Sequence, residues 1–292
     1  MDSEERDKLL KAGKIAREVL EFVKLGAKPG VKLLDLANKA DGKIFALDGR
    51  PAFPINLSLN HIAAHYTPGI DDETVFTDND ILKIDVGVHV DGFIADTACT
   101  VGFDKELIKA SEEALKAAIK VCRPGVKVSE IGREVEEVIT SYEGYTPIRN
   151  LNGHSLAQYE LHSGITIPNF DDSSQTVLND GDVIAIEPFA TTGVGRVKTG
   201  KPSGIFRLEC IRPIRSMEAR KLMKFIESKY RSLPFARRWI ASMPANLLNL
   251  NILEREEVLH QYPELPEESK GLVSQAEHTV IIGDKPVVTT RD

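Results

Sequence analysis

Hydrophobic residues recur with helical spacing in two separate stretches of the chain, and the same short turn sequence follows each stretch. The spacing predicts amphipathic helices that include residues 15–23 and 115–122. The turns that follow read KPGVKLLDL at residues 28–36 and RPGVKVSEI at residues 123–131. A second helical pattern comes after each turn. The two stretches therefore have the same predicted order of elements.

A second pair of matching segments follows in the same order. Residues 75–85 read VFTDNDILKID and residues 177–187 read VLNDGDVIAIE, so that Asp85 and Glu187 fall on equivalent positions of equivalent predicted strands. Two matches with nearly equal offsets indicate a duplicated unit of two helices and a strand pair. We expect an α+β fold, with helices packed on a curved antiparallel sheet about a pseudo-two-fold axis. Asp85 and Glu187 should face each other across that axis.

The segment LKIDVGVHVDGFIADTA, residues 82–98, predicts a β-hairpin that carries carboxylates where apolar residues are usual. The tight turn falls at Asp91-Gly92 or one residue earlier, at Val90-Asp91. Either turn puts Asp85 and Asp96 on one face, opposed or diagonal, roughly 5 to 8 Å apart. Two such carboxylates repel each other, so they are either solvated or share a cation.

Composition narrows the class of protein. A chain of 292 residues with 42% hydrophobic and 28% charged residues is typical of a soluble globular protein. The net charge of −7 argues against a surface built for nucleic acid, and we expect no specific DNA partner, although a local basic patch is compatible with it. The start MDSEERDKLL is not a signal peptide, and no apolar run is long enough for a membrane helix. We expect a cytoplasmic monomer without a membrane partner.

Further candidate ligands lie in two other segments. Glu277 interrupts the apolar strand pattern GLVSQAEHTVII, where an unpaired carboxylate would be costly. The segment NGHSLAQYELHSG supplies His154 and His162. Four carboxylates with one neutral imidazole carry a charge of −4, which two divalent cations would cancel. The pattern predicts a dinuclear metal site.

The order and context of these residues resemble the methionine aminopeptidases of the pita-bread (creatinase/aminopeptidase) fold, and specifically the type II, archaeal-like branch. The resemblance runs over essentially the full length. The segments that carry it are PAFPINLSLNHIAAHYTP (51–68), the hairpin, NLNGHS, ELHSGITIPN, AIEPFA, LPFARRW (233–239) and SQAEHTVI.

The resemblance implies a set of metal ligands and two catalytic histidines. Two divalent ions, of cobalt, manganese, iron(II) or zinc, would be held by Asp85, Asp96, His154, Glu187 and Glu277. Asp96 and Glu277 would bridge the ions, and Glu187 would accept the proton of the attacking water. His162 would polarise the scissile carbonyl and His65 would lie near the departing amide nitrogen. An apolar pocket for the methionine side chain would be lined by Phe53, Leu161 and Phe189.

The implied activity is removal of the initiator methionine from nascent chains, with preference for a small second residue. Two alternatives stay open: a prolidase-like dipeptidase of the same fold, and a non-catalytic binding module. The segment GRVKTGKP at residues 195–202 almost matches a phosphate loop, but Pro202 replaces the hydroxyl that would hold magnesium.

About ninety residues separate Glu187 from Glu277, and their middle resembles the helical insert of type II enzymes. We expect a catalytic domain of residues 1–194 and 271–292 and an insert of residues 195–270. Between residues 212 and 238, nine basic residues face two acidic ones. The predicted helix there should bury Leu222, Phe225, Ile226 and Tyr230 and expose Arg220, Lys224, Glu227 and Arg231. This basic surface is either an ordinary solvated face or a docking site for ribosomal RNA.

Overall fold

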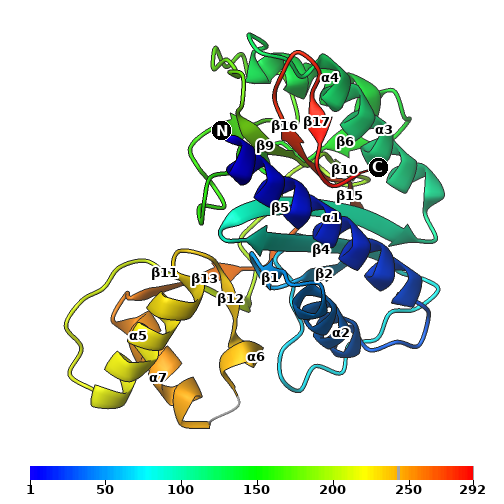
Figure 1. Ribbon diagram of the computed structural model, residues 1–292. Helices are drawn as coiled ribbons and strands as arrows, with labels where there is room; N and C mark the ends of the chain where they lie inside the picture. Colours follow the sequence, from blue (N-terminus) through cyan, green and yellow to red (C-terminus); the bar gives the residue numbers. More distant parts are fainter. Residues whose placement is uncertain (242–243, 292) are drawn as a thin grey trace.

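Two similar halves make up most of the molecule, and a smaller unit projects from one side (Figure 1). The computed structural model describes residues 1–241 and 244–291. The first half holds α1 (Ser3–Gly26), α2 (Leu33–Ala46), β1 (Arg50–Pro51), β2 (Asn56–Leu59), β3 (Ile62–Ala64), β4 (Ile81–Val90) and β5 (Phe93–Gly102). The second half holds α3 (Lys105–Val121), α4 (Val128–Thr140), β6 (Thr146–Pro147), β7 (Gly153–Ser155), β8 (Thr166–Ile167), β9 (Val183–Ile186) and β10 (Phe189–Thr191).

The two PGVK turns adopt the same local structure. Gly30 donates its backbone N–H to Phe76 O, and Gly125 donates to Leu178 O, each at 2.8 Å. Their φ angles are 90° and 88°, a region in which only glycine is unstrained. Phe76 and Leu178 lie at the starts of the two matching segments, residues 75–85 and 177–187. Each turn therefore contacts the matching segment of its own half, which confirms the duplicated unit.

The β4–β5 hairpin settles the register that the sequence left open. Val90 pairs with Phe93, so the turn is Asp91-Gly92, with φ angles of 50° and 90°. Asp85 is opposite Ala98 and Asp96 is opposite Gly87, which makes the two acids diagonal neighbours on one face. The opposite face packs against the helices: Figure 1 shows α1 lying along the hairpin.

The end of the chain joins the two halves. It holds β15 (Val273–Gln275), β16 (His278–Ile281) and β17 (Val287–Val288). In the second half, β15 pairs with β10 and β16 pairs with β9, while Glu277, between them, bridges to Ala98 of β5 in the first half. Each half keeps its own apolar core, one beneath α1 and α2 and one beneath α3 and α4. The seam between the two cores is where the candidate acids lie.

The segment between the halves and the last strands has a core of its own. It contains β11 (Pro202–Leu208), α5 (Met217–Tyr230), β12 (Phe235–Ala236), α6 (Arg237–Ile240), α7 (Pro244–Arg255), β13 (Leu259–Pro263) and β14 (Leu265–Pro266). Strands β12, β11 and β13 form a sheet under α5 and α7, which the expectation of a helical insert did not include. The domain boundaries at 194/195 and 270/271 stay predictions, and the expected end at Asp292 lies outside the described residues.

Helix α5 differs from its expected orientation. Met223 is buried in place of Phe225, which is 44% exposed. Arg231 lies beyond the end of the helix, with its guanidinium carbon 4.1 Å from the ring centroid of Tyr159. Arg238 is buried in an ion pair with Asp41 at 2.9 Å. The four residues expected on the outer face, Arg220, Lys224, Glu227 and Arg231, are exposed. Arg231 nevertheless stacks on Tyr159 beyond the helix and Arg238 is buried, so Arg220 and Lys224 are the cations of α5 considered below for docking.

Candidate active site

One cavity of about 200 Å³ brings together the acids, histidines and apolar side chains singled out in the sequence. The cavity lies at the seam between the two halves and is closed on one side by the insert. Its lining includes all ten predicted site residues: Phe53, His65, Asp85, Asp96, His154, Leu161, His162, Glu187, Phe189 and Glu277.

Short strands position the five candidate ligands. Asp85 and Asp96 lie on β4 and β5, His154 lies on β7, and Glu187 directly follows β9. In the sequence repeat, Glu187 is the equivalent of Asp85 in β4. Glu277 occupies the break between β15 and β16. Each ligand therefore comes from a hydrogen-bonded strand or its end, which holds it more rigidly than a surface loop would.

Threonine hydroxyls fasten the two acids that the sequence assigns as bridging. Thr279 Oγ1 accepts the N–H of Asp96 at 2.7 Å and lies 2.8 Å from Asp96 O, to which it donates. Thr97 Oγ1 donates to Glu277 O at 2.9 Å, and the N–H of Glu277 donates to Ala98 O at 2.9 Å. The main chain at Asp96 is thus tied to the strand that follows Glu277.

The ligand atoms converge on a small volume. His154 Nε2 lies 3.8 Å from both Asp96 Oδ2 and Glu187 Oε1. Donor atoms of Asp96, His154 and Glu277 all lie within 4.8 Å of one another. Gln275 donates weakly from Nε2 to Glu187 Oε2 at 3.4 Å and to Glu277 Oε2 at 3.5 Å. Sequence reasoning missed Gln275, although its place two residues before Glu277 on a strand was a signal that both share a face.

The electrostatics of the cluster are those of buried acids without a cationic side chain. Burial raises the pKa of Asp85 to about 7. Burial, followed by repulsion from neighbouring carboxylates, raises the pKa values of Asp96, Glu187 and Glu277 well above their usual range. Burial lowers the pKa of His154 to about 3, so this imidazole is neutral. In the described chain, Oδ1 of both aspartates is buried without a hydrogen-bond partner.

The two other histidines lie on the wall of the same cavity. The rings of His154 and His162 are 4.3 Å apart. His65 Nδ1 lies 3.1 Å from Pro263 O, and since a carbonyl only accepts, Nδ1 carries the proton and Nε2 is the free nitrogen. Burial lowers the pKa of His65 to about 4. The rings of His65 and Tyr262 of the insert lie edge to face with centroids 5.4 Å apart, and the sequence gave no signal for Tyr262 as a cavity residue.

The apolar wall is built by close packing. Phe53 lies against Gly87 of β4, where an added Cβ would come within 2.1 Å of its ring. Glycine at this position therefore lets the aromatic ring lie directly on the hairpin beside Asp85. Phe189 is fully buried, while Leu161 is partly buried next to His162. The three side chains form a hydrophobic surface next to the polar cluster.

Comparison with known proteins shows where the chain belongs. The family model of metallopeptidase family M24 matches residues 7–213. The chain belongs to metallopeptidase family M24. It is 47% identical over 295 residues to a methionine aminopeptidase of Methanocaldococcus jannaschii, with 100% of both chains covered.

Solved structures confirm the pita-bread fold of this M24 metallopeptidase. A methionine aminopeptidase from Thermotoga maritima superposes with a TM-score of 0.74 at 22% identity and covers 100% of this chain and 98% of its own. A prolidase from Pyrococcus furiosus gives a TM-score of 0.64 at 18% identity, and covers 100% of this chain and 65% of its own. Both enzymes share the fold, so the fold alone does not choose between their activities. Among the described helices, none has the length and apolarity to cross a membrane.

The donor set of the cluster fits the divalent ions that an M24 metallopeptidase requires. Carboxylate oxygens and a neutral imidazole are ligands for divalent first-row metals. Within the described residues, the ion-pair contacts of the four acids are with His154, which is neutral. The orphaned oxygens of Asp85 and Asp96 are therefore available as metal ligands.

The raised acid pKa values predict that the metal-free protein becomes less stable as the pH rises from 7 to 8.5. The folded chain retains protons on the acid cluster that the unfolded chain, with carboxyl pKa values near 4, has already lost. Each retained proton lowers the free energy of unfolding by about 1.4 kcal/mol per pH unit. The buried histidines oppose this trend only below about pH 7, where the unfolded histidines are still protonated. Lys83 opposes it across the whole range, because burial holds its pKa well below the usual range while the unfolded lysine stays protonated. One lysine against four acids leaves the sign of the trend unchanged. Urea unfolding after chelation measures the effect.

Adding a divalent metal should reverse that trend and stabilise the protein more at pH 8.5 than at pH 7, because the ligands must be deprotonated. The variant Asp85→Asn removes one of the titrating groups and should flatten the metal-free profile. A free energy of unfolding that rises with pH in the metal-free protein would contradict this account.

Proposed function

We propose that the protein is a metal-dependent aminopeptidase that removes N-terminal methionine from peptides and nascent proteins. The observation that carries the proposal is the convergence of five candidate metal ligands, two histidines and an apolar wall in one cavity. The full-length identity of 47% to a methionine aminopeptidase supports the choice of substrate.

Two divalent ions, of cobalt, manganese, iron(II) or zinc, would be held by Asp85, Asp96, His154, Glu187 and Glu277. When bound, these ions would supply the Lewis acidity that lowers the pKa of a water molecule and polarises the carbonyl. The hydrogen bonds at Asp96 and Glu277 support their assignment as the bridging ligands, because both are anchored where the two halves meet. His154 comes from the second half and would complete the set together with Glu187.

Glu187 is the proposed proton acceptor for the attacking water. Gln275 donates a weak hydrogen bond to its Oε2 at 3.4 Å, and its Oε1 lies 3.8 Å from His154 Nε2. His162 would donate a hydrogen bond to the scissile carbonyl oxygen. His65 would lie beside the departing nitrogen, with its tautomer fixed by the bond to Pro263 O. These roles rest on the positions of the side chains around one cavity.

The size of the cavity supports specificity for an unbranched apolar side chain. Phe53, Leu161 and Phe189 would contact the methionine side chain, and about 200 Å³ leaves room for little else. The remaining wall comes from the insert, which includes Ile205 and Tyr262. A narrow cavity of this kind should also favour a small second residue.

Two alternatives are less well supported. A prolidase-like dipeptidase would share the fold and the ligands, but the full-length identity of 47% is to a methionine aminopeptidase. A non-catalytic binding module would not need a complete set of buried acids, whose repulsion is unfavourable without a cation.

The metal assignment predicts that Asp96→Asn or Glu277→Gln removes bound metal and activity together. Either change removes a negative charge that the cluster uses to hold cations. The amide that replaces the carboxylate has nearly the same shape and can still form hydrogen bonds. We expect less than about 1% of wild-type turnover, in line with loss of metal chemistry, and a retained fold. Metal content per chain and Met-Ala hydrolysis are the measurements.

Glu264→Gln is a suitable control, because Glu264 is buried near the site but pairs with Lys201 at 3.4 Å outside the cluster. It should keep its metal and its turnover. Two bound ions and near-normal turnover in Asp96→Asn would show that the bridging role is wrong.

The cavity predicts a restricted substrate range. We expect kcat/KM for Met-Ala to exceed that for Met-Arg by at least about tenfold, which corresponds to about 1.4 kcal/mol of lost transition-state binding. Ala-Pro should be a poor substrate. Faster hydrolysis of Ala-Pro than of Met-Ala would favour the prolidase alternative, and equal values for Met-Ala and Met-Arg would exclude a restricted second site.

Five broader expectations belong to this proposal. The protein is proposed to act as a cytoplasmic monomer, with residues 195–270 as a separate insert subdomain. Its substrates would be nascent chains, and the basic surface of α5 around Arg220 and Lys224 would dock on ribosomal RNA through phosphate contacts. Both side chains are exposed, which such contacts require.

Docking of this kind predicts that Arg220→Glu with Lys224→Glu abolishes co-sedimentation with ribosomes at low salt. Peptide turnover should be unchanged, because neither residue lines the cavity. Binding of the wild-type protein should weaken steeply as salt is raised. Glu256→Lys on the surface near the end of α7 serves as a charge-changing control. If the double variant sediments with ribosomes like the wild type, α5 is an ordinary solvated helix.

A further inference from the structure

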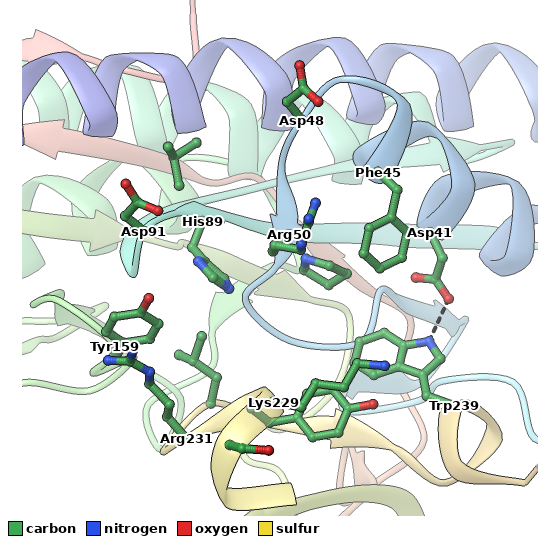
Figure 2. A pocket seen from close by; sticks show the side chains of 15 residues that line it. Asp41, Phe45, Asp48, Arg50, His89, Asp91, Tyr159, Lys229, Arg231 and Trp239 are labelled. Carbon is green, nitrogen blue, oxygen red and sulfur yellow. Dashed lines mark hydrogen bonds between the residues drawn. The ribbon is translucent and has the colours of Figure 1, made fainter. Parts of the chain in front are cut away.

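A second cavity, of about 600 Å³, lies between α2 and the insert (Figure 2). It shares no lining residue with the candidate active site in the described chain. Its size is within the range of small-ligand sites. In Figure 2, Arg50 lies above the cavity, Lys229 and Arg231 lie below it, and the aromatic rings of Phe45 and Trp239 lie at one end.

The cations of this cavity have no acidic partner. Among the described residues, Arg50, Lys229 and Arg231 form no ion pair: Arg50 donates to Gly49 O, and all three lie over aromatic rings. The acids of the lining are largely engaged elsewhere. Asp41 accepts from Arg238 at 2.9 Å and from Trp239 at 2.7 Å, and Asp91 pairs with Lys8 at 3.3 Å. The third acid of the lining, Asp48, faces the three cations Arg50, Lys229 and Arg231, so the unpaired charges of the lining leave the cavity net positive.

His89 lies beside these cations, and its pKa is lowered. Its Nδ1 accepts the N–H of Gly92 at 3.0 Å in the hairpin turn, and its ring lines the cavity. Burial lowers the pKa of His89 to about 4; the charge of Arg50 adds to the lowering, that of Asp91 opposes it, and that of Arg231 adds to it again. A neutral imidazole thus lies beside the cations, where an anion would be favoured.

The aromatic end of the cavity is rigid. Trp239 stacks on Tyr230 with ring centroids 5.9 Å apart, and Tyr230 stacks on Phe235, which belongs to the core of the insert, at 4.9 Å. The hydrogen bond from Trp239 Nε1 to Asp41 fixes the indole in its plane. The Arg238 guanidinium carbon also lies 5.5 Å from the indole centroid, so a flat ligand would stack on the part of the Trp239 ring that lines the cavity.

The backbone beside the cavity is strained at Arg231 and Tyr159, whose side chains line the cavity. Arg231 has φ 55° and ψ −121°, and Tyr159 has φ 60°, both unfavourable for residues with large side chains. These two residues hold each other, since the Arg231 guanidinium stacks on the Tyr159 ring and Ser232 Oγ donates to Tyr159 O. The strain maintains a cation at the edge of the cavity, as at binding sites in general.

We propose that this cavity is a second binding site, for a free nucleoside phosphate. The nucleobase would stack at the end formed by Phe45 and Trp239, and the phosphate groups would lie between Arg50 and Lys229. This site is distinct from the segment GRVKTGKP, whose Pro202 lacks the hydroxyl of a phosphate loop. A free nucleotide fits better than an RNA strand, because Asp48 and Asp91 lie toward the edges of the cavity and would repel further phosphates (Figure 2).

Trp239 makes the test direct, because it is the only tryptophan of the chain. The metal-loaded protein is titrated with ADP, with magnesium in excess of the nucleotide so that the active site keeps its metal. Trp239 fluorescence should change in a saturable way, and calorimetry should give the same Kd. Adenosine, which lacks phosphate, and inorganic diphosphate, which lacks the ring, should each bind at least about tenfold more weakly.

The double variant Arg50→Ala with Lys229→Ala should weaken ADP binding by at least about tenfold. Lys224→Ala is the matched control: it removes one cation from the same helix, but Lys224 does not line the cavity. Both should hydrolyse Met-Ala like the wild type, which shows that they are folded. If turnover falls in the double variant, Arg50→Gln with Lys229→Gln replaces it.

Three results would overturn the proposal. The first is the absence of a saturable signal with both ADP and GDP, and the second is equal affinity of the charge-deleted variant and the wild type. The third is binding of diphosphate alone as tightly as ADP, which would leave only a general anion site. Tighter binding of a short RNA than of ADP would instead assign the cavity to an RNA strand.

Discussion

The burial of four carboxylates within a few ångströms of one another is the constraint on which the rest of this structure depends. Burying an ionised carboxylate without a partner costs free energy, and repulsion between neighbouring carboxylates raises that cost. Here Asp96 and Glu277 are nearly inaccessible, and their pKa values are raised far above the usual range. In the absence of cations the acids are kept close by retained protons and by hydrogen bonds. The bonds of Thr279 and Thr97 hold the main chain at Asp96 and Glu277, and the weaker bonds of Gln275 reach the carboxylates of Glu187 and Glu277.

Duplication provides a simple way to build such a cluster. Asp85 and Glu187 occupy equivalent positions in the two halves, so the symmetry that pairs the halves also brings these acids together. The end of the chain then adds Glu277 at the seam, where it bridges to Ala98. Nearby, Lys83 is fully buried and donates to Asn60 O and Val273 O, each at 2.8 Å, which binds the hairpin to β15. The rigid seam belongs to the whole fold rather than to any single loop.

The sequence predicted the features that depend on local patterns and missed those that depend on contacts between residues far apart in the chain. The hairpin, the repeat and the convergence of the acids could be predicted because they depend on alternation, turn residues and matching segments. The strands of the insert could not, since β11 pairs with β13 across about fifty residues. The orientation of α5 was partly wrong because Met223 and Phe225 are both apolar, and only the shape of the neighbouring core decides between them. Arg231 is exposed as expected, but its contact with Tyr159 could not be predicted because the two residues are far apart in the sequence.

The insert has a role in the site that its position in the sequence does not suggest. It is fastened to the first half by the pairing of β14 with β3 and by the bonds of Arg238 and Trp239 to Asp41. Through Tyr262 and Ile205 it also forms one wall of the active-site cavity. The acids, in contrast, all come from the duplicated halves and the last strands. The apolar side chains Phe53, Leu161 and Phe189 come from the duplicated halves as well. The insert therefore closes a cavity whose candidate ligands and apolar wall are built by the duplicated halves and the last strands, and it adds the remaining wall through Ile205 and Tyr262.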